Sequence, residues 1–293
     1  MSTQAVDTQT QTRWTDDQIA ERLVEIRRVV EEERRARFAD FGIDPQCLWP
    51  CSRLFHEQSS LGPAWNPVLT PEQVSELTQD LDYKRYPGAE RLALPRPEPL
   101  TLSLEAAIRK RRSVRQFSER AIPLADLAKL LELCSGVTEI DEIPRRAAPS
   151  GGGLYPVETY ALTLGVESVP TALWHYAALD HELEHVRPLS GSADLNSFFP
   201  PGLLRGGPRL VLAFSVVFGR TQLKYIERGY RFGLLEAGHI AQNAALTATA
   251  LGLGALCVGG FWDDPFNRLL GLDSEREAVV YAVMLGYPSL CGD

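Results

Sequence analysis

The 293-residue chain predicts an α+β fold in which a mostly antiparallel sheet is surrounded by helices. Helix-like and strand-like patterns are mixed along residues 96–293, without the strict strand–helix–strand rhythm of a parallel sheet. Two strand-like runs flank Asp180, as the strands of an antiparallel hairpin do. A long helix-like run over 225–251 is apolar on most sides, which places it at the centre of the fold.

Residues 14–95 are expected to form a helical extension and linker ahead of the main domain, after a polar, disordered tail over 1–13. The first helix begins at Thr15, whose capping-box partner is Gln18, and ends at Gly42. One face of this helix is apolar and the rest is charged, so we expect it to lie against a larger body.

The following linker contains four prolines, so residues 43–70 are expected to be irregular. Thr70 then caps a second helix, which has Pro71 at its first position. A proline-rich bridge places the start of the main domain at residue 96.

The main domain is expected to contain helices and strands in mixed order. Gly136 should stop the second of its helices. The predicted helices cover 103–112, 123–135 and 225–251, and the predicted strands cover 157–164, 173–178, 183–189, 210–218, 255–261 and 278–285.

The composition excludes several classes of protein. A net charge of −8 argues against coating of nucleic acid or of an anionic membrane. Residues 244–261 carry no charge but contain glycines and threonines, which favours a buried helix and strand over a membrane span. Five cysteines and no secretory signal predict a reduced, cytoplasmic protein.

Two stretches of the sequence resemble zinc-binding motifs, but neither is expected to bind zinc. HELEH at 181–185 matches a zinc-protease motif that works on a helix, but its flanks alternate as strands do, so we expect a surface hairpin. Cys47, Cys51 and His56 have no clear fourth ligand, and a thiol pair in a loop is the favoured interpretation. No metal is therefore expected.

Two further sequences invite nucleotide or nucleic-acid binding. GLGALCVGG at 252–260 follows a helix and has Cys257 at the third glycine position, which argues against a dinucleotide fingerprint. The basic run at 109–115 resembles a nucleic-acid patch, but no wider basic surface accompanies it. A solvated helix end would also explain these cations.

Three stretches point instead to one flat, anionic ligand. Arginine forks suit a phosphate, and glycine backbone can lie against a flat ring without Cβ interference. FMN needs both, together with a cation and an N–H donor near its ring. The predicted cofactor-binding residues are Arg111, Arg112, Ser113 and Arg115 in the first stretch, Pro149, Ser150, Gly151, Gly152 and Leu154 in the second, and Gly259 and Gly260 in the third.

Four motifs occur in the order R-R-S-x-R-x-F, P-S-G-G-G-L-Y-P-x-E-x-Y, K-Y-x-x-R-G-Y-R-x-x-L-L-E-A-G-H-x-x-Q-N and G-G-F. Together they resemble the nitroreductase superfamily, and more narrowly its SagB-type branch. That branch includes flavin dehydrogenases that oxidise thiazolines and oxazolines to azoles in peptide natural products. The resemblance runs from about residue 56 to 286 and implies a nitroreductase-like sandwich that forms a homodimer, with FMN at the subunit interface.

The resemblance also implies roles for the three stretches. Arg111, Ser113 and Arg115 would hold the phosphate and the polar edge of the ring, and the second and third stretches would border the ring from two sides. One departure is that the chain ends YPSLCGD, where many nitroreductases carry basic residues. Either Arg111 and Arg112 suffice for the phosphate, or Arg228 or Arg231 takes that place.

The branch matches Lys224 and Tyr225 to a catalytic Lys–Tyr pair. A desolvated lysine can act as a base near neutral pH, although a solvated lysine and a packed tyrosine would explain the residues by themselves equally well. His239 is expected to be a hydrogen-bonded core histidine, with Glu236 or Asn243 as its partner or at the border of the site, and Asn243 is included among the cofactor-binding residues.

The leading hypothesis is an FMN-dependent dehydrogenase of a peptide azoline, with a ribosomal precursor or carrier-bound peptide as substrate and a cyclodehydratase as partner. Oxygen is the expected electron acceptor. Two alternatives stay open: a general NAD(P)H-dependent nitro or quinone reductase, and a non-catalytic flavin-binding scaffold subunit.

Overall fold

The computed structural model describes residues 50–62, 83–96, 98–140, 144–203 and 207–289, together with positions 21, 24, 25 and 28. The chain divides into two units, Met1–Ser60 and Leu61–Asp293. The predicted tail over 1–13 and the predicted helix at Thr70 lie outside the described residues. Of the predicted helix over 15–41, the four described positions are helical.

The first unit contains the helix α2 (Pro50–Gln58), where we expected an irregular segment. The prediction was wrong because Pro50 opens the helix, and a proline is tolerated at the first helical position, where its missing N–H is not needed. Cys51 and His56 are exposed on this helix, so the expected loop is not formed there; Cys47 lies outside the described residues.

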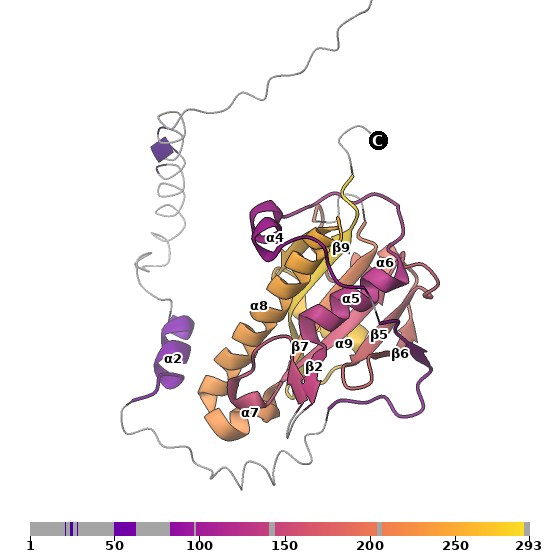
Figure 1. Ribbon diagram of the computed structural model, residues 1–293. Helices are drawn as coiled ribbons and strands as arrows, with labels where there is room; N and C mark the ends of the chain where they lie inside the picture. Colours follow the sequence, from indigo (N-terminus) through magenta and orange to yellow (C-terminus); the bar gives the residue numbers. More distant parts are fainter. Residues whose placement is uncertain are drawn as a thin grey trace, which may run out of the picture. The chain divides into compact units, whose positions relative to one another are not determined.

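The second unit is built on a seven-stranded sheet whose neighbouring strands are all antiparallel, as the fold class predicts (Figure 1). Its strand order is β1-β6-β5-β4-β7-β9-β8. The strands are β1 (Arg91–Ala93), β4 (Val157–Thr163), β5 (Ala172–Ala177), β6 (Glu182–Pro188), β7 (Leu210–Val217), β8 (Gly254–Val258) and β9 (Glu277–Gly286).

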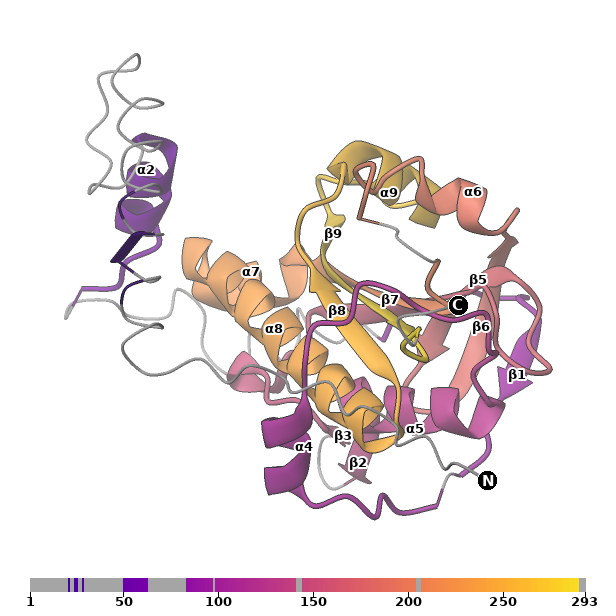
Figure 2. The same ribbon diagram turned by 90° about the horizontal axis from the view of Figure 1, so that it is seen from above.

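Helices cover both faces of the sheet (Figure 2). One face packs against α5 (Leu124–Ser135) and α8 (Glu227–Ala250), with α4 (Leu104–Lys110) against α8, and the other face packs against α6 (Ser192–Leu195) and α9 (Asp263–Leu270). The alternation of β4 explains this, because Val157 and Ala161 point into the first core, whereas Tyr160 and Leu162 point into the second.

The predicted central helix over 225–251 is confirmed as α8, and a second helix, α7 (Phe218–Tyr225), which was not predicted, precedes it. They are separated at Ile226, whose φ of 52° is left-handed and cannot continue a helix. The structure also contains elements that the patterns did not predict: β1, α6, α9 and the small hairpin of β2 (Val137–Ile140) and β3 (Pro144–Arg146).

The HELEH segment forms part of β6, in a hairpin with β5, as predicted. It does not lie at the surface, however, because β1 pairs with its outer side and Glu184 is fully buried. The proposed domain start at residue 96 stays a prediction, and β1 lies just before it. None of the described helices is long and apolar enough to cross a membrane.

Candidate functional site

The basic segment lies beside the edge strand β8. Helix α4 ends at Lys110, and the chain then runs extended, with Ser113 bridging Ala255 and the Val114 N–H donating to the Ala255 carbonyl at 3.0 Å. This close approach depends on Gly254, since a Cβ there would lie 2.7 Å from the Val114 side chain. The Ser113 and Arg115 side chains are exposed along this edge.

The first and third predicted stretches meet at an open groove of about 820 Å³. Arg115 and Gly260 line it together with 200–203 and 288–289. Gly259 and Gly260 follow the end of β8 and are both exposed, and a Cβ at Gly260 would face open space. We call Arg111, Arg112, Ser113, Arg115, Gly259 and Gly260 the basic group.

Two arginines of the basic group lie against neighbouring parts of the protein. Arg112 folds back on the end of α4, and its Nη1 donates to the carbonyls of Arg109 and Arg111 at 2.8 Å each. Arg111 is half-buried and lies near Cys257. Burial raises the pKa of the Cys257 thiol, and a hydrogen bond with Tyr281 and the Arg111 charge oppose that rise.

The glycine-rich stretch forms a short 3₁₀ turn, η1 (Gly151–Gly153). Gly152 and Gly153 have φ angles of 70° and 69°, which favour glycine. A Cβ on Gly152 would lie 2.6 Å from Tyr225 Oη and 3.0 Å from Lys224 Nζ. The bare backbone of this turn therefore lies directly against the predicted Lys–Tyr pair.

Lys224 and Tyr225 form the last turn of α7 and are half-buried. The Tyr225 ring meets Phe232 edge to face at 4.9 Å, and Lys224 Nζ lies 5.3 Å from the Tyr225 ring centre. Phe232 also limits the turn from the other side, because a Cβ on Gly151 would lie 3.2 Å from its ring. We call residues 149–154, Lys224 and Tyr225 the glycine-loop group.

The remaining predicted residues lie around this loop. Pro149 is exposed and Leu154 is half-buried at the end of the turn. Asn243 Nδ2 donates to the Ala147 carbonyl at 3.4 Å, so Asn243 reaches the segment that leads into the loop. His239 is exposed, and the predicted core histidine was wrong because its position on α8 faces away from the sheet-side core residues Ala237 and Ile240.

Glu236 lies beside the glycine-loop group, and its role was left open by the sequence. It is 3% exposed, and its Oε2 has no hydrogen-bond partner. Burial raises the pKa of Glu236 to about 7, against the opposing effects of a hydrogen bond from Ser150 and of Arg146 and Arg220. Ser150 Oγ in turn accepts a hydrogen bond from the Tyr155 N–H at 2.9 Å, so this carboxyl supports the loop.

Glu158 and Arg220 were not among the predicted site residues. They form an ion pair of 2.6 Å immediately beyond the glycine loop. Burial alone would raise the pKa of Glu158, but Arg220 and His175 outweigh it and lower the pKa to about 2. Glu158 stands in the glycine-rich motif, and a charged residue on an otherwise apolar strand was the one available signal.

Comparison with known proteins gives the chain a family. The family model described as the nitroreductase family matches residues 108–287. The Methanocaldococcus jannaschii protein MJ1384, named as a nitroreductase, is 32% identical over 182 residues, which is 59% of this chain and 87% of that protein.

Two further matches concern microcin B17. The Escherichia coli microcin B17-processing protein McbC is 31% identical over 147 residues, or 48% of this chain, and the match spans only about half of its own length, 54%. In the structure of the E. coli microcin synthetase McbBCD complex with truncated pro-MccB17 bound, the matching chain has a TM-score of 0.58 at 22% identity. That match covers 87% of this chain and 98% of the other and supports the fold.

Proposed function

The chain belongs to the nitroreductase family, and from this premise we propose that it is an FMN-dependent dehydrogenase that oxidises a peptide-borne azoline to an azole. The observation that carries the proposal is the contact of the bare Gly152 backbone with Lys224 and Tyr225. A base beside a planar cofactor can take a proton from the substrate, and a glycine backbone lets the two approach closely. The relative that processes microcin B17 supports a peptide as the substrate.

The residues fit FMN. Arg111 and Arg115 offer guanidinium groups for its phosphate, and Arg115 lines the open groove together with Gly260. The turn of Gly151 and Gly152 would border the ring, and a Cβ on either glycine would collide with Phe232 or with Tyr225 and Lys224. When bound, FMN supplies the acceptor for the hydride that leaves the substrate.

Lys224 and Tyr225 complete the balance of the reaction. The azoline loses a hydride from one ring carbon and a proton from the neighbouring Cα, and the new ring double bond forms between these carbons. Lys224 receives the proton, and Tyr225, in contact with the same glycine, donates or relays it. Phe232 packs against Tyr225 and shields the pair from water on that side.

We propose that two copies of the chain complete the site, so that the basic group of one protomer and the glycine-loop group of its partner face each other across FMN. Exposed apolar side chains provide a surface for this packing, including Leu104 and Ile108 on α4 and Leu234 and Leu235 on α8. A cyclodehydratase that forms the azoline is the proposed partner, and the likeness to a chain of a microcin synthetase complex supports an assembly of this kind.

The test is conversion of a synthetic thiazoline peptide by the purified protein loaded with FMN. Mass spectrometry should show the loss of two hydrogen atoms from the peptide. Lys224→Ala should keep FMN and abolish the conversion, whereas Lys110→Ala, which changes an exposed lysine on α4, should convert the peptide normally. Full conversion by Lys224→Ala would overturn the assigned base.

The similarity to the M. jannaschii protein supports a second candidate, a general NAD(P)H-dependent nitro or quinone reductase. The two functions differ in the source of the hydride. Rapid bleaching of the bound flavin by NADPH, with no bleaching by the thiazoline peptide, would favour the reductase.

A further inference from the structure

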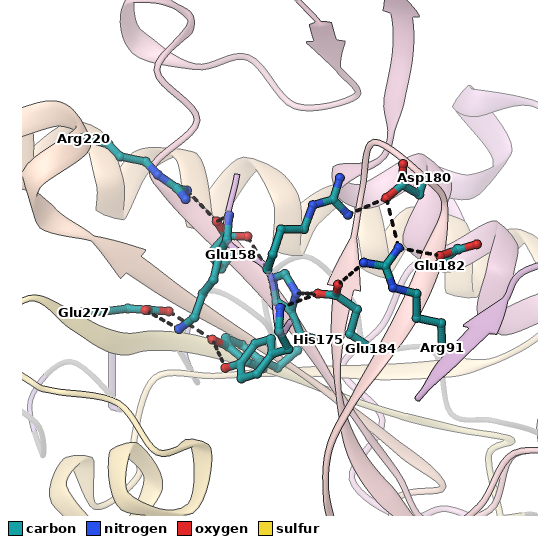
Figure 3. Close-up of polar contacts among 12 residues, drawn as sticks. Arg91, Glu158, His175, Asp180, Glu182, Glu184, Arg220 and Glu277 are labelled. Atoms are coloured by element: carbon teal, nitrogen blue, oxygen red, sulfur yellow. Dashed lines mark hydrogen bonds and ion pairs between the residues drawn. The ribbon is translucent and has the colours of Figure 1, made fainter. Parts of the chain in front are cut away.

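A chain of buried charges crosses the sheet and reaches the helix that carries Lys224 (Figure 3). We call Arg220, Glu158, His175 and Glu184 the charge chain. Arg220 Nη1 lies 2.6 Å from Glu158 Oε1, Glu158 Oε2 lies 3.1 Å from His175 Nε2, and His175 Nδ1 lies 3.0 Å from Glu184 Oε2. All four residues are at most 5% exposed.

Both ring nitrogens of His175 lie within hydrogen-bonding distance of a carboxylate oxygen, Nε2 of Glu158 and Nδ1 of Glu184. The other oxygens of these carboxylates lie next to cations, Arg220 at Glu158 and Arg91 at Glu184, at 3.3 Å from the latter. The imidazole therefore connects two buried carboxyl groups, each of which also faces an arginine.

The buried ion pair at the inner end of the charge chain favours one arrangement of its members. Removing one partner of a buried pair leaves an uncompensated charge, which is costly, so the paired geometry is strongly preferred. Glu158 also accepts from the backbone N–H of Lys84 at 3.3 Å, and Glu184 from that of Tyr86 at 3.2 Å. The charge chain therefore involves β4, β5 and β6 and contacts the segment before β1.

The inner end of the chain holds the reactive helix. Arg220 lies on α7 one turn before Lys224, on the same side of the helix. Its Nη1 also donates to the Tyr155 carbonyl at 3.0 Å, directly after the glycine loop. Arg220 therefore connects the helix that carries Lys224 with the loop that Lys224 contacts.

Helix α7 needs such an anchor. It has only eight residues, begins without a side-chain cap and ends at the left-handed Ile226. Helices of this length are not stable on their own, so their position comes from tertiary contacts. Arg220 and Thr221 are the two buried residues of α7, and Arg220 forms the ion pair with Glu158.

We propose that Arg220, Glu158 and His175 are positioning residues, which fix Lys224 and Tyr225 against the Gly152 backbone so that the proton is taken from a defined direction. The inference deepens the proposed function and rests on it for the identity of the reaction. The residues act through α7 and touch neither substrate nor flavin in this proposal.

The experiment compares Glu158→Gln with a matched variant, Glu277→Gln. Glu277 is another buried glutamate of the same sheet, and it is paired with Lys84 at 2.6 Å and accepts from Ser215 at 2.6 Å. The pair of variants separates loss of the contact to α7 from loss of any buried ion pair. Amide hydrogen exchange of the whole protein is followed in peptides that cover 218–225, together with flavin reduction by the thiazoline peptide.

We expect α7 to exchange on the order of tenfold faster in Glu158→Gln and to be unchanged in Glu277→Gln. The rate of flavin reduction at saturating peptide should fall on the order of tenfold to a hundredfold in Glu158→Gln, with KM unchanged. Arg220→Lys, which keeps the charge, should fall between wild type and Arg220→Ala on both measures.

Two outcomes overturn the inference: equal exchange of α7 in all variants, or an equal fall in rate for Glu158→Gln and Glu277→Gln. The exchange measurement needs no substrate, so it still decides the inference if the wild-type protein fails to oxidise the thiazoline peptide. That failure would reject the proposed function alone. If Glu158→Gln does not fold, the comparison of Arg220→Lys with Glu277→Gln decides the same question.

Discussion

The glycine-loop group and the basic group differ in how much of their order the protein itself supplies. In the glycine-loop group, Lys224 and Tyr225 pack on Gly152, and Arg220 connects their helix with a buried glutamate. In the basic group, Arg112, Ser113 and Arg115 are exposed beside an open groove, as are Gly259 and Gly260. The fold therefore holds the proposed Lys–Tyr pair in place, whereas Arg115 of the basic group extends an exposed cation beside the groove.

The largest expected effect lies at the anchor of the glycine-loop group. Arg220→Ala removes the cation from Glu158 and leaves that carboxylate buried, which should lower the free energy of unfolding by about 3–5 kcal/mol. Urea denaturation measures this change. The control is Arg109→Ala, which breaks an exposed pair with Glu105 and should cost at most about 1 kcal/mol.

If Arg220→Ala and Arg109→Ala lose similar amounts of stability, the ion pair at α7 is no stronger than one at the surface. The fold would then not hold the glycine-loop group more firmly than the basic group.

The second prediction concerns Glu236, which is buried beside the glycine-loop group. One of its carboxyl oxygens has no hydrogen-bond partner. Its pKa is about 7 in the fold against an ordinary 4.5, so the unfolded chain ionises first as the pH rises. The folded state therefore loses stability between pH 4.5 and 7, by about 3 kcal/mol in total. Glu236→Gln removes this loss.

The two proteins should be about equally stable below pH 4.5, and the variant should be the more stable one above pH 7. Urea denaturation across this range checks the sign. A constant difference between the two proteins at every pH would show that Glu236 does not titrate in this range.

Only part of the fold could be predicted from the sequence. Strands and helices of the sheet layer were predictable because alternation and helical periodicity are local, and β4, β5, β7 and α5 lie within a few residues of their predicted ranges. The break at Ile226 was not predictable, since a positive φ is rare for a β-branched residue.

The site follows the same division. The glycines and arginines could be chosen as candidates from the sequence, and the family model matches the range that contains them. The contact of Glu158 with Arg220 joins residues 62 positions apart (220 minus 158), and no spacing rule connects them. The unsatisfied oxygen of Glu236 is likewise a property of packing, which a pattern of residue types does not contain.

The third prediction turns to the basic group. Arg111→Ala should weaken FMN binding by one to two decades, because a charge-assisted contact to phosphate contributes about 1.5–3 kcal/mol. The free energy of unfolding without flavin should change little, in contrast with Arg220→Ala. Fluorescence titration of FMN and urea denaturation measure the two quantities.

Unchanged FMN affinity in Arg111→Ala would remove Arg111 from the phosphate site. A large loss of stability without flavin would instead show that the fold, and not the ligand, uses this arginine.

The smallest expected effect on stability comes from Gly152→Ala, in which backbone strain and a steric clash with Tyr225 can be separated. Gly152→Ala introduces a Cβ at a φ of 70° and brings it 2.6 Å from Tyr225 Oη, whereas Gly88→Ala meets a φ of 79° with nothing within 4 Å. Both variants should lose about 1–2 kcal/mol of stability from the left-handed backbone. Only Gly152→Ala should also displace Tyr225 and slow the oxidation of the thiazoline peptide. If it oxidises the peptide as fast as Gly88→Ala, then the close approach of this backbone to the Lys–Tyr pair does not serve the reaction.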